Sequence, residues 1–81
     1  MDALTLTNRM NRVVFTAQEW PDGTYSYHAV GAGGMSMIRE TVLERAVMHK
    51  AWNPSATATG PLASEFENKI RERAQLRSEM R

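Results

Sequence analysis

The stretch AVGAGGMSM, residues 29–37 of this 81-residue chain, contains the residue types of a phosphate-binding loop. A dinucleotide-binding loop needs the pattern G-x-G-x-x-G, in which the last glycine lets the following helix pack closely. Gly31 and Gly33 match the first two positions, but Ser36 stands at the third, and no acid follows about 20 residues later. A P-loop needs Lys and then Ser or Thr after its last glycine, where this chain has Met35. We therefore interpret the stretch as a flexible connection between a strand and a helix.

The other titratable residues do not form a catalytic or metal-binding pattern. His28 and His49 are the only histidines, and their spacing matches neither HxxxH nor HExxH. The absence of Cys excludes thiolate ligands and disulfides. Glu40 and Glu44 are one helical turn apart, which is typical of a solvated helix edge. We therefore expect a protein that is not an enzyme, with no catalytic residues, no metal and no cofactor.

Three residues of a predicted β-hairpin are candidates for contact with a partner: Trp20, Asp22 and His28. Trp20 is expected beside the hairpin tip, on the face away from the apolar residues. An exposed tryptophan is a common anchor in protein interfaces. The alternative is that Trp20 lies under the N-terminal segment or the last helix.

Three arginines near the end of the chain form a second group of candidates: Arg71, Arg73 and Arg77. They could contact phosphates or an acidic protein surface. Glu72 and Glu79 interrupt the series, so the alternative is a solvated helix that forms its own ion pairs.

Residues 12–30 predict the β-hairpin that would position the first group. Two stretches rich in Val, Phe, Tyr and Thr flank Pro21, Asp22 and Gly23, which suit a three-residue hairpin loop with a left-handed glycine. This loop places Trp20 opposite Thr24. It gathers most apolar side chains on one face: Val13, Phe15, Ala17, Tyr25, Tyr27 and Ala29. The other face carries Thr16, Gln18, Trp20, Ser26 and His28.

Two amphipathic helices are expected after the hairpin. The first covers residues 35–52, with Ser36 as its N-cap, a core-facing Trp52 near its end and Pro54 beyond it. Its apolar stripe comprises Met35, Ile38, Val42, Leu43, Ala46 and Val47. The second helix covers residues 62–81, with Leu62, Phe66, Ile70, Ala74 and Met80 on one side. Acid and base four residues apart predict two ion pairs within this helix, Glu65–Lys69 and Glu67–Arg71.

These elements predict a single α+β domain. A two- or three-stranded antiparallel sheet is packed by one helix and followed by a second helix. Residues 1–11 are either an N-terminal arm or a short strand beside the hairpin, since Leu4 and Leu6 alternate with threonines. Residues 53–61 are small, polar and unpatterned, and we interpret them as a connector.

The composition places the chain among globular proteins, with 42% hydrophobic and 23% charged residues. The net charge is +1, and no segment has the basic excess that is usual in nucleic-acid-binding proteins. No apolar run approaches the roughly 18 residues of a membrane span, and the N-terminus has no signal-peptide pattern. We therefore expect a cytoplasmic protein that does not associate with membranes.

Residues 13–52 resemble two families in their layout. The run DGTYSYHAVGAGGMSMIRETVLERAVMHKAW is similar to the hairpin-then-helix arrangement of small phage-encoded anti-CRISPR proteins, which are non-enzymatic inhibitors of a host complex. With AQEWPDGTYSY, it also resembles the start of HicB-type antitoxins, in which a Gly-Tyr strand precedes a helix. Both resemblances imply a binding protein of bacterial or phage origin.

The sequence therefore predicts a protein-binding module whose partner is a host protein or protein complex, in the sharper form a phage- or mobile-element-encoded inhibitor. Two alternatives remain open. One is a small nucleic-acid-associated protein or antitoxin that contacts phosphates through arginines. The other is a homodimeric structural protein, because a thin sheet can pair across an edge.

Overall fold

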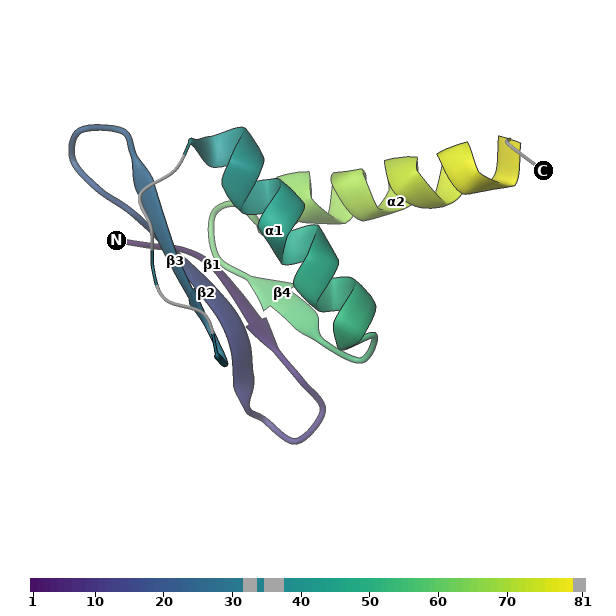
Figure 1. Ribbon diagram of the computed structural model, residues 1–81, viewed down its shortest axis with the longest axis horizontal. Coiled ribbons are helices and arrows are strands. Elements are labelled where there is room, and N and C mark those ends of the chain that lie inside the picture. Colours follow the sequence, from purple (N-terminus) through teal and green to yellow (C-terminus); the bar gives the residue numbers. More distant parts are fainter. Residues whose placement is uncertain (32–33, 35–37, 80–81) are drawn as a thin grey trace.

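The computed structural model describes residues 1–31, 34 and 38–79, which form an α+β fold with a four-stranded antiparallel sheet and two helices (Figure 1). The elements follow the order β1 (Asp2–Thr7), β2 (Val13–Glu19), β3 (Tyr25–Ala29), α1 (Arg39–Trp52), β4 (Thr57–Thr59) and α2 (Ala63–Glu79). The strands lie in the order β3-β2-β1-β4. The α+β class is confirmed, and the sheet has one strand more than the two or three expected.

The hairpin of β2 and β3 has the predicted register. The Trp20 amide donates to the Thr24 carbonyl at 2.9 Å, and Gly23 has a φ of 86°. Phe15 stands opposite Ala29. The predicted apolar face is buried except at two positions: Tyr27 is half-buried, and Val13 is 53% exposed. Burial of Val13 was therefore a wrong prediction, because this residue opens β2 beside a register shift with β1.

The N-terminal segment is a strand and not an arm, which settles the alternatives for residues 1–11. β1 lies between β2 and β4, and Leu4 and Leu6 are fully buried. β4, however, falls in the stretch 53–61 that we expected to be a connector, so this expectation was wrong. Its three residues pair with β1, Thr5 standing opposite Thr59. So short a strand forms because β1 offers a free edge, and the sequence has no pattern for it.

A glycine lets the chain pass closely over β1 between β4 and α2. Gly60 has a φ of 107°, and a Cβ atom on it would lie 2.7 Å from the carbonyl oxygen of Ala3. That same oxygen accepts a hydrogen bond of 2.9 Å from the Leu62 amide. The turn therefore places the start of α2 against the core.

Helix α1 buries the predicted positions Val42, Leu43, Ala46 and Val47 against the sheet. It begins at Arg39, after an extended Ile38 that provides no side-chain cap. Ile38 is 67% exposed, which corrects its expected place in the core and follows from its position before the first helical turn. The predicted cap Ser36 and the predicted core residue Met35 lie outside the described residues.

Two predictions about the ends of the helices were wrong. Trp52, expected in the core, is 65% exposed at the last residue of α1. In α2, Leu62 and Phe66 are buried and Ile70 is half-buried, but every residue from 71 to 79 is exposed, Ala74 included. Figure 1 shows α2 extending away from the rest of the molecule. Met80 lies outside the described residues.

Candidate functional site

One face of the sheet is polar, and both helices pack on the opposite face, which carries Leu4, Leu6 and Phe15. Strand register aligns a row of side chains across all four strands of the polar face: Thr59, Thr5, Thr16 and His28. The neighbouring row contains Asp2, Gln18 and Ser26, and Gln18 Nε2 donates to Asp2 Oδ1 at 3.2 Å. We call these two rows, together with Trp20, the open face.

Trp20 and His28 share a shallow hollow on the open face, with a volume of about 430 Å³. The hollow is lined mainly by polar side chains and by Gly34: Thr16, Gln18, Trp20, Ser26, Tyr27, His28 and Gly34. The Trp20 indole N–H donates to Ser26 Oγ at 2.9 Å, and the residue is 48% exposed. The structure thus brings together two of the predicted contact residues and leaves much of the indole ring accessible.

Asp22 lies at the hairpin tip, and its carboxylate is hydrogen-bonded within the turn. Its Oδ1 accepts hydrogen bonds from the backbone amide of Thr24 at 3.0 Å and from the Thr24 hydroxyl at 2.6 Å. The hydroxyl and the amide, in that order, lower the pKa of Asp22. This carboxylate therefore stabilises the loop next to Trp20.

Only two glycines of the glycine-rich stretch lie within the described residues. Gly31 has a φ of 79°, and a Cβ atom on Gly34 would lie 2.5 Å from the Tyr27 carbonyl oxygen. The backbone at Gly34 therefore passes directly beside β3. The rest of the predicted flexible connection, residues 32–33 and 35–37, lies outside the description, so its flexibility stays a prediction.

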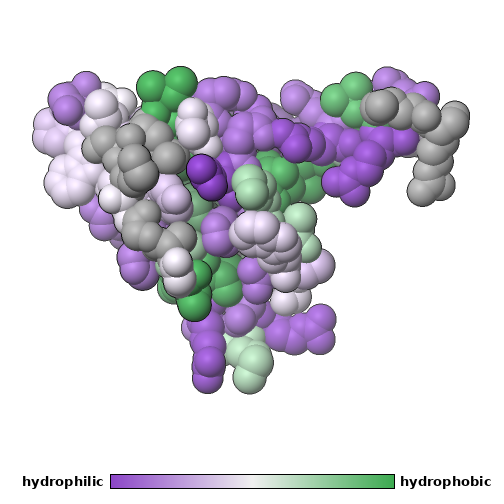
Figure 2. Space-filling model, viewed as in Figure 1, coloured by the Kyte–Doolittle hydropathy of each residue, from purple (hydrophilic) through white to green (hydrophobic). Residues whose placement is uncertain are grey.

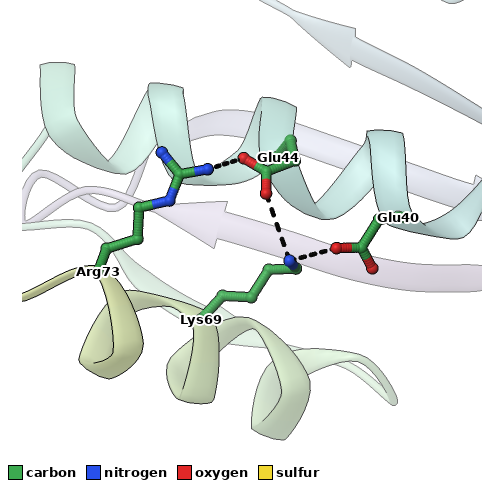
Figure 3. A network of polar contacts seen from close by, with 4 residues as sticks. All are labelled: Glu40, Glu44, Lys69 and Arg73. Atoms are coloured by element: carbon green, nitrogen blue, oxygen red, sulfur yellow. Dashed lines mark hydrogen bonds and ion pairs between the residues drawn. The ribbon is translucent and has the colours of Figure 1, made fainter. Parts of the chain in front are cut away.

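Ion pairs between α1 and α2 replace the two pairs predicted within α2 (Figure 3). Lys69 contacts Glu40 and also Glu44, the latter at 3.3 Å, and Arg73 contacts the other oxygen of Glu44. Glu65 pairs with Arg39. Glu65 and Lys69 pair with α1 because residues of the crossing helix compete for their charges. Arg71 instead donates to Asn68 on its own helix.

These contacts shift two pKa values in the directions that stabilise the ion pairs. Burial raises the pKa of Glu44, but hydrogen bonds from Lys69 and Arg73 outweigh it, and the net shift is downward. The hydrogen bond to Glu40 raises the pKa of Lys69. Both groups are therefore charged at neutral pH, and the solvated edge formed by Glu40 and Glu44 also carries the ion pairs with α2.

The three arginines of the second predicted group differ in their surroundings. Arg71 donates to Asn68 on its own helix, Arg73 is engaged with Glu44, and Arg77 is exposed. They lie on α2, away from the hairpin loop that follows β2 in Figure 1. Trp20 and the arginines therefore do not form one surface.

Sequence reasoning missed two further features around the end of α1. The His49 ring lies between two aromatic rings, with centroids 5.3 Å from Phe15 and 5.1 Å from Trp52. A groove of about 320 Å³ separates the last turns of α1 from α2. Both depend on how α1 crosses its neighbours, and no local sequence signal reports this.

Across residues 1–31, 34 and 38–79, no group of three His, Asp or Glu side chains is arranged to hold a metal ion. Within the same ranges, neither helix has the length and apolar character needed to cross a membrane. Comparisons with protein-family models, characterised proteins and solved structures found no match to this chain.

Proposed function

We propose that the protein is a non-enzymatic binding module that docks on a partner protein through the open face, with Trp20 as the anchor. The observation that carries this proposal is the half-exposed Trp20 ring, which the Ser26 hydroxyl holds in place beside His28. A large side chain that is already ordered loses little conformational entropy on binding. The surrounding hydroxyl, amide and imidazole groups can supply the hydrogen bonds of the interface rim.

The layout of residues 13–52 supports a sharper form of this proposal. Its similarity to phage-encoded anti-CRISPR proteins favours an inhibitor that covers a functional site on a host complex. In that form the partner is a bacterial protein complex, and the hairpin of β2 and β3 inserts Trp20 into it.

Affinity capture from bacterial lysate, with and without nuclease, tests the proposal. We expect a defined protein partner that survives nuclease treatment, is lost with Trp20→Ala and is weakened with His28→Ala. Leu76→Ala is the matched control, because Leu76 is also an exposed apolar residue but lies on α2 and not on the open face. Capture by this variant should be unchanged.

Two results would contradict the proposal. One is a Trp20→Ala variant that has the thermal midpoint of the wild type and still captures the partner. The other is recovery of nucleic acid alone, lost at higher salt, which would favour phosphate contacts through Arg71 and Arg77.

A further inference from the structure

The groove between α1 and α2 is a second surface, separate from the open face. It lies where the two helices diverge after the ion pairs of Glu44, and it is lined by Val47, Lys50, Ala51, Pro54, Ile70, Arg73, Ala74 and Arg77. Figure 2 shows hydrophobic surface in this angle, next to the hydrophilic side chains of α2. The groove is therefore an apolar floor with a polar margin.

The floor of the groove consists of residues that the protein's own fold leaves partly uncovered. Val47 is nearly buried and Ile70 half-buried, whereas Ala51 and Ala74 are exposed. One alanine lines the groove from α1 and the other from α2, and their short side chains permit close approach of another backbone. A segment laid along this line would cover the half-buried Ile70 and the two exposed alanines.

The margin of the groove is positively charged. Three of its lining residues are basic, Lys50, Arg73 and Arg77, and none is acidic. The Lys50 ammonium donates to the carbonyl oxygens of Pro54 and Ala56 at 2.7 and 2.6 Å. Arg73 and Lys69 both contact Glu44, and Arg77 makes no ion pair with any residue in the described ranges. The charge of Arg77 is therefore available to a carboxylate from outside.

The backbone of the groove walls further limits the type of occupant. Most of the lining residues lie within α1 or α2, where their N–H groups are bonded inside the helices. A strand placed here would find few backbone partners, whereas a helix satisfies its own hydrogen bonds. Helix-in-groove recognition uses apolar anchors at positions i, i+3, i+4 and i+7.

We propose that this groove binds an acidic amphipathic helix of a partner protein. Apolar side chains of that helix lie over Val47, Ile70 and the two alanines, and its carboxylates meet Arg77 and Arg73. The proposal does not depend on Trp20, because the open face and the groove share no residue.

A random-peptide display selection on the intact protein, followed by affinity measurements on the enriched peptides, tests this inference. We expect enriched peptides with apolar residues at helical spacing and Asp or Glu beside them. Arg77→Glu should weaken their binding roughly tenfold or more, because like charges then face each other. Arg71→Glu is the matched control, since Arg71 lies on the same helix but does not line the groove. Trp20→Ala should also leave the affinity unchanged.

Backbone amide shifts measured by NMR locate the binding site. We expect the largest changes at Ala51 and Ala74. Selection of no peptide, or of basic or uncharged peptides only, overturns the proposal, as does affinity that is insensitive to Arg77→Glu. Shifts confined to the open face, with binding lost in Trp20→Ala, contradict peptide binding in the groove and support the proposed function.

Discussion

The two tryptophans have different chemical surroundings although both are exposed. The indole N–H of Trp20 is bound by Ser26 on the neighbouring strand, and its ring borders the hollow of the open face. The Trp52 ring packs nearly perpendicular to the ring of His49, which in turn contacts Phe15. Trp52 therefore covers part of the core and makes a structural contribution, whereas the Trp20 ring has its face available to a partner.

At the residue scale, His49 is expected to make stability depend on pH. Burial, and after it the charge of Arg45, lowers the pKa of His49 below its usual value of 6.5. The unfolded chain then binds the proton more readily, so the free energy of unfolding decreases as the pH falls from 6.5 toward the pKa of the folded state. Denaturant unfolding at several pH values should show this slope in the wild type and not in His49→Gln. His28→Gln is the control, and an unchanged slope in His49→Gln would refute the assignment.

A comparison of Gly60 with Gly23 distinguishes the destabilising effect of a steric clash from that of backbone strain. Both have positive φ values, but a Cβ atom on Gly23 meets nothing within 4 Å, while on Gly60 it would lie 2.7 Å from the Ala3 carbonyl oxygen. We expect Gly23→Ala to cost about 1–2 kcal/mol from the left-handed backbone alone. Gly60→Ala should cost clearly more, because the chain must also move away from β1. Urea denaturation of both variants checks this order, and equal costs would contradict it.

At the scale of elements, α2 is attached to the body only along its first half. Phe66 is fully buried, and the contacts of Lys69 and Arg73 with α1 lie just beyond it. Residues 71–79 continue the helix without burial. The buried Phe66 therefore anchors α2, and the ion pairs lie between this anchor and the groove.

Removal of the central carboxylate of this network should weaken the protein only modestly. Glu44 is partly exposed, so Glu44→Gln is expected to cost less than about 1 kcal/mol at neutral pH. Because the pKa of Glu44 is lowered from 4.5, its contribution is present above 4.5 and is lost as the pH falls through the folded-state pKa. Unfolding experiments should therefore show the wild type and Glu44→Gln converging in acid. The control is Glu67→Gln on the exposed side of α2, and a constant difference at all pH values would contradict the prediction.

At the scale of the whole molecule, the two ends of the described chain contribute unequally to the fold. β1 pairs with β2 on one side and β4 on the other, and it supplies two fully buried leucines. The exposed turns of α2 supply none of the buried core.

Two truncations test this asymmetry. Deletion of residues 1–7 should abolish folding, because the sheet loses its connection to β4 and the core loses Leu4 and Leu6. Deletion of residues 71–81 should leave a cooperative transition with a slightly lower midpoint, since only the Arg73 contact with Glu44 is lost from the described contacts between the helices. Thermal melts followed by circular dichroism and the dispersion of NMR chemical shifts distinguish a folded from an unfolded variant. A folded chain without residues 1–7 would refute the central role of β1.

The sequence by itself determined the features that depend on residues close together in the chain. The Pro-Asp-Gly loop sets the register of β2 and β3, because turn geometry decides which residues face each other. Helical spacing likewise identified the buried side of α1. It also placed Trp20 and His28 on one face of the hairpin.

Only the tertiary structure decided the features that depend on where an element stands relative to distant ones. β4 is a strand because β1 has a free edge, and Trp52 lies on the outer side of His49, where it is exposed. Lys69 pairs with α1 because the helices cross there, although Glu65 lies four residues away on its own helix. The groove with Arg77 at its margin arises from the same crossing. Distances between elements far apart in the sequence create these features, and no local pattern of residue types contains them.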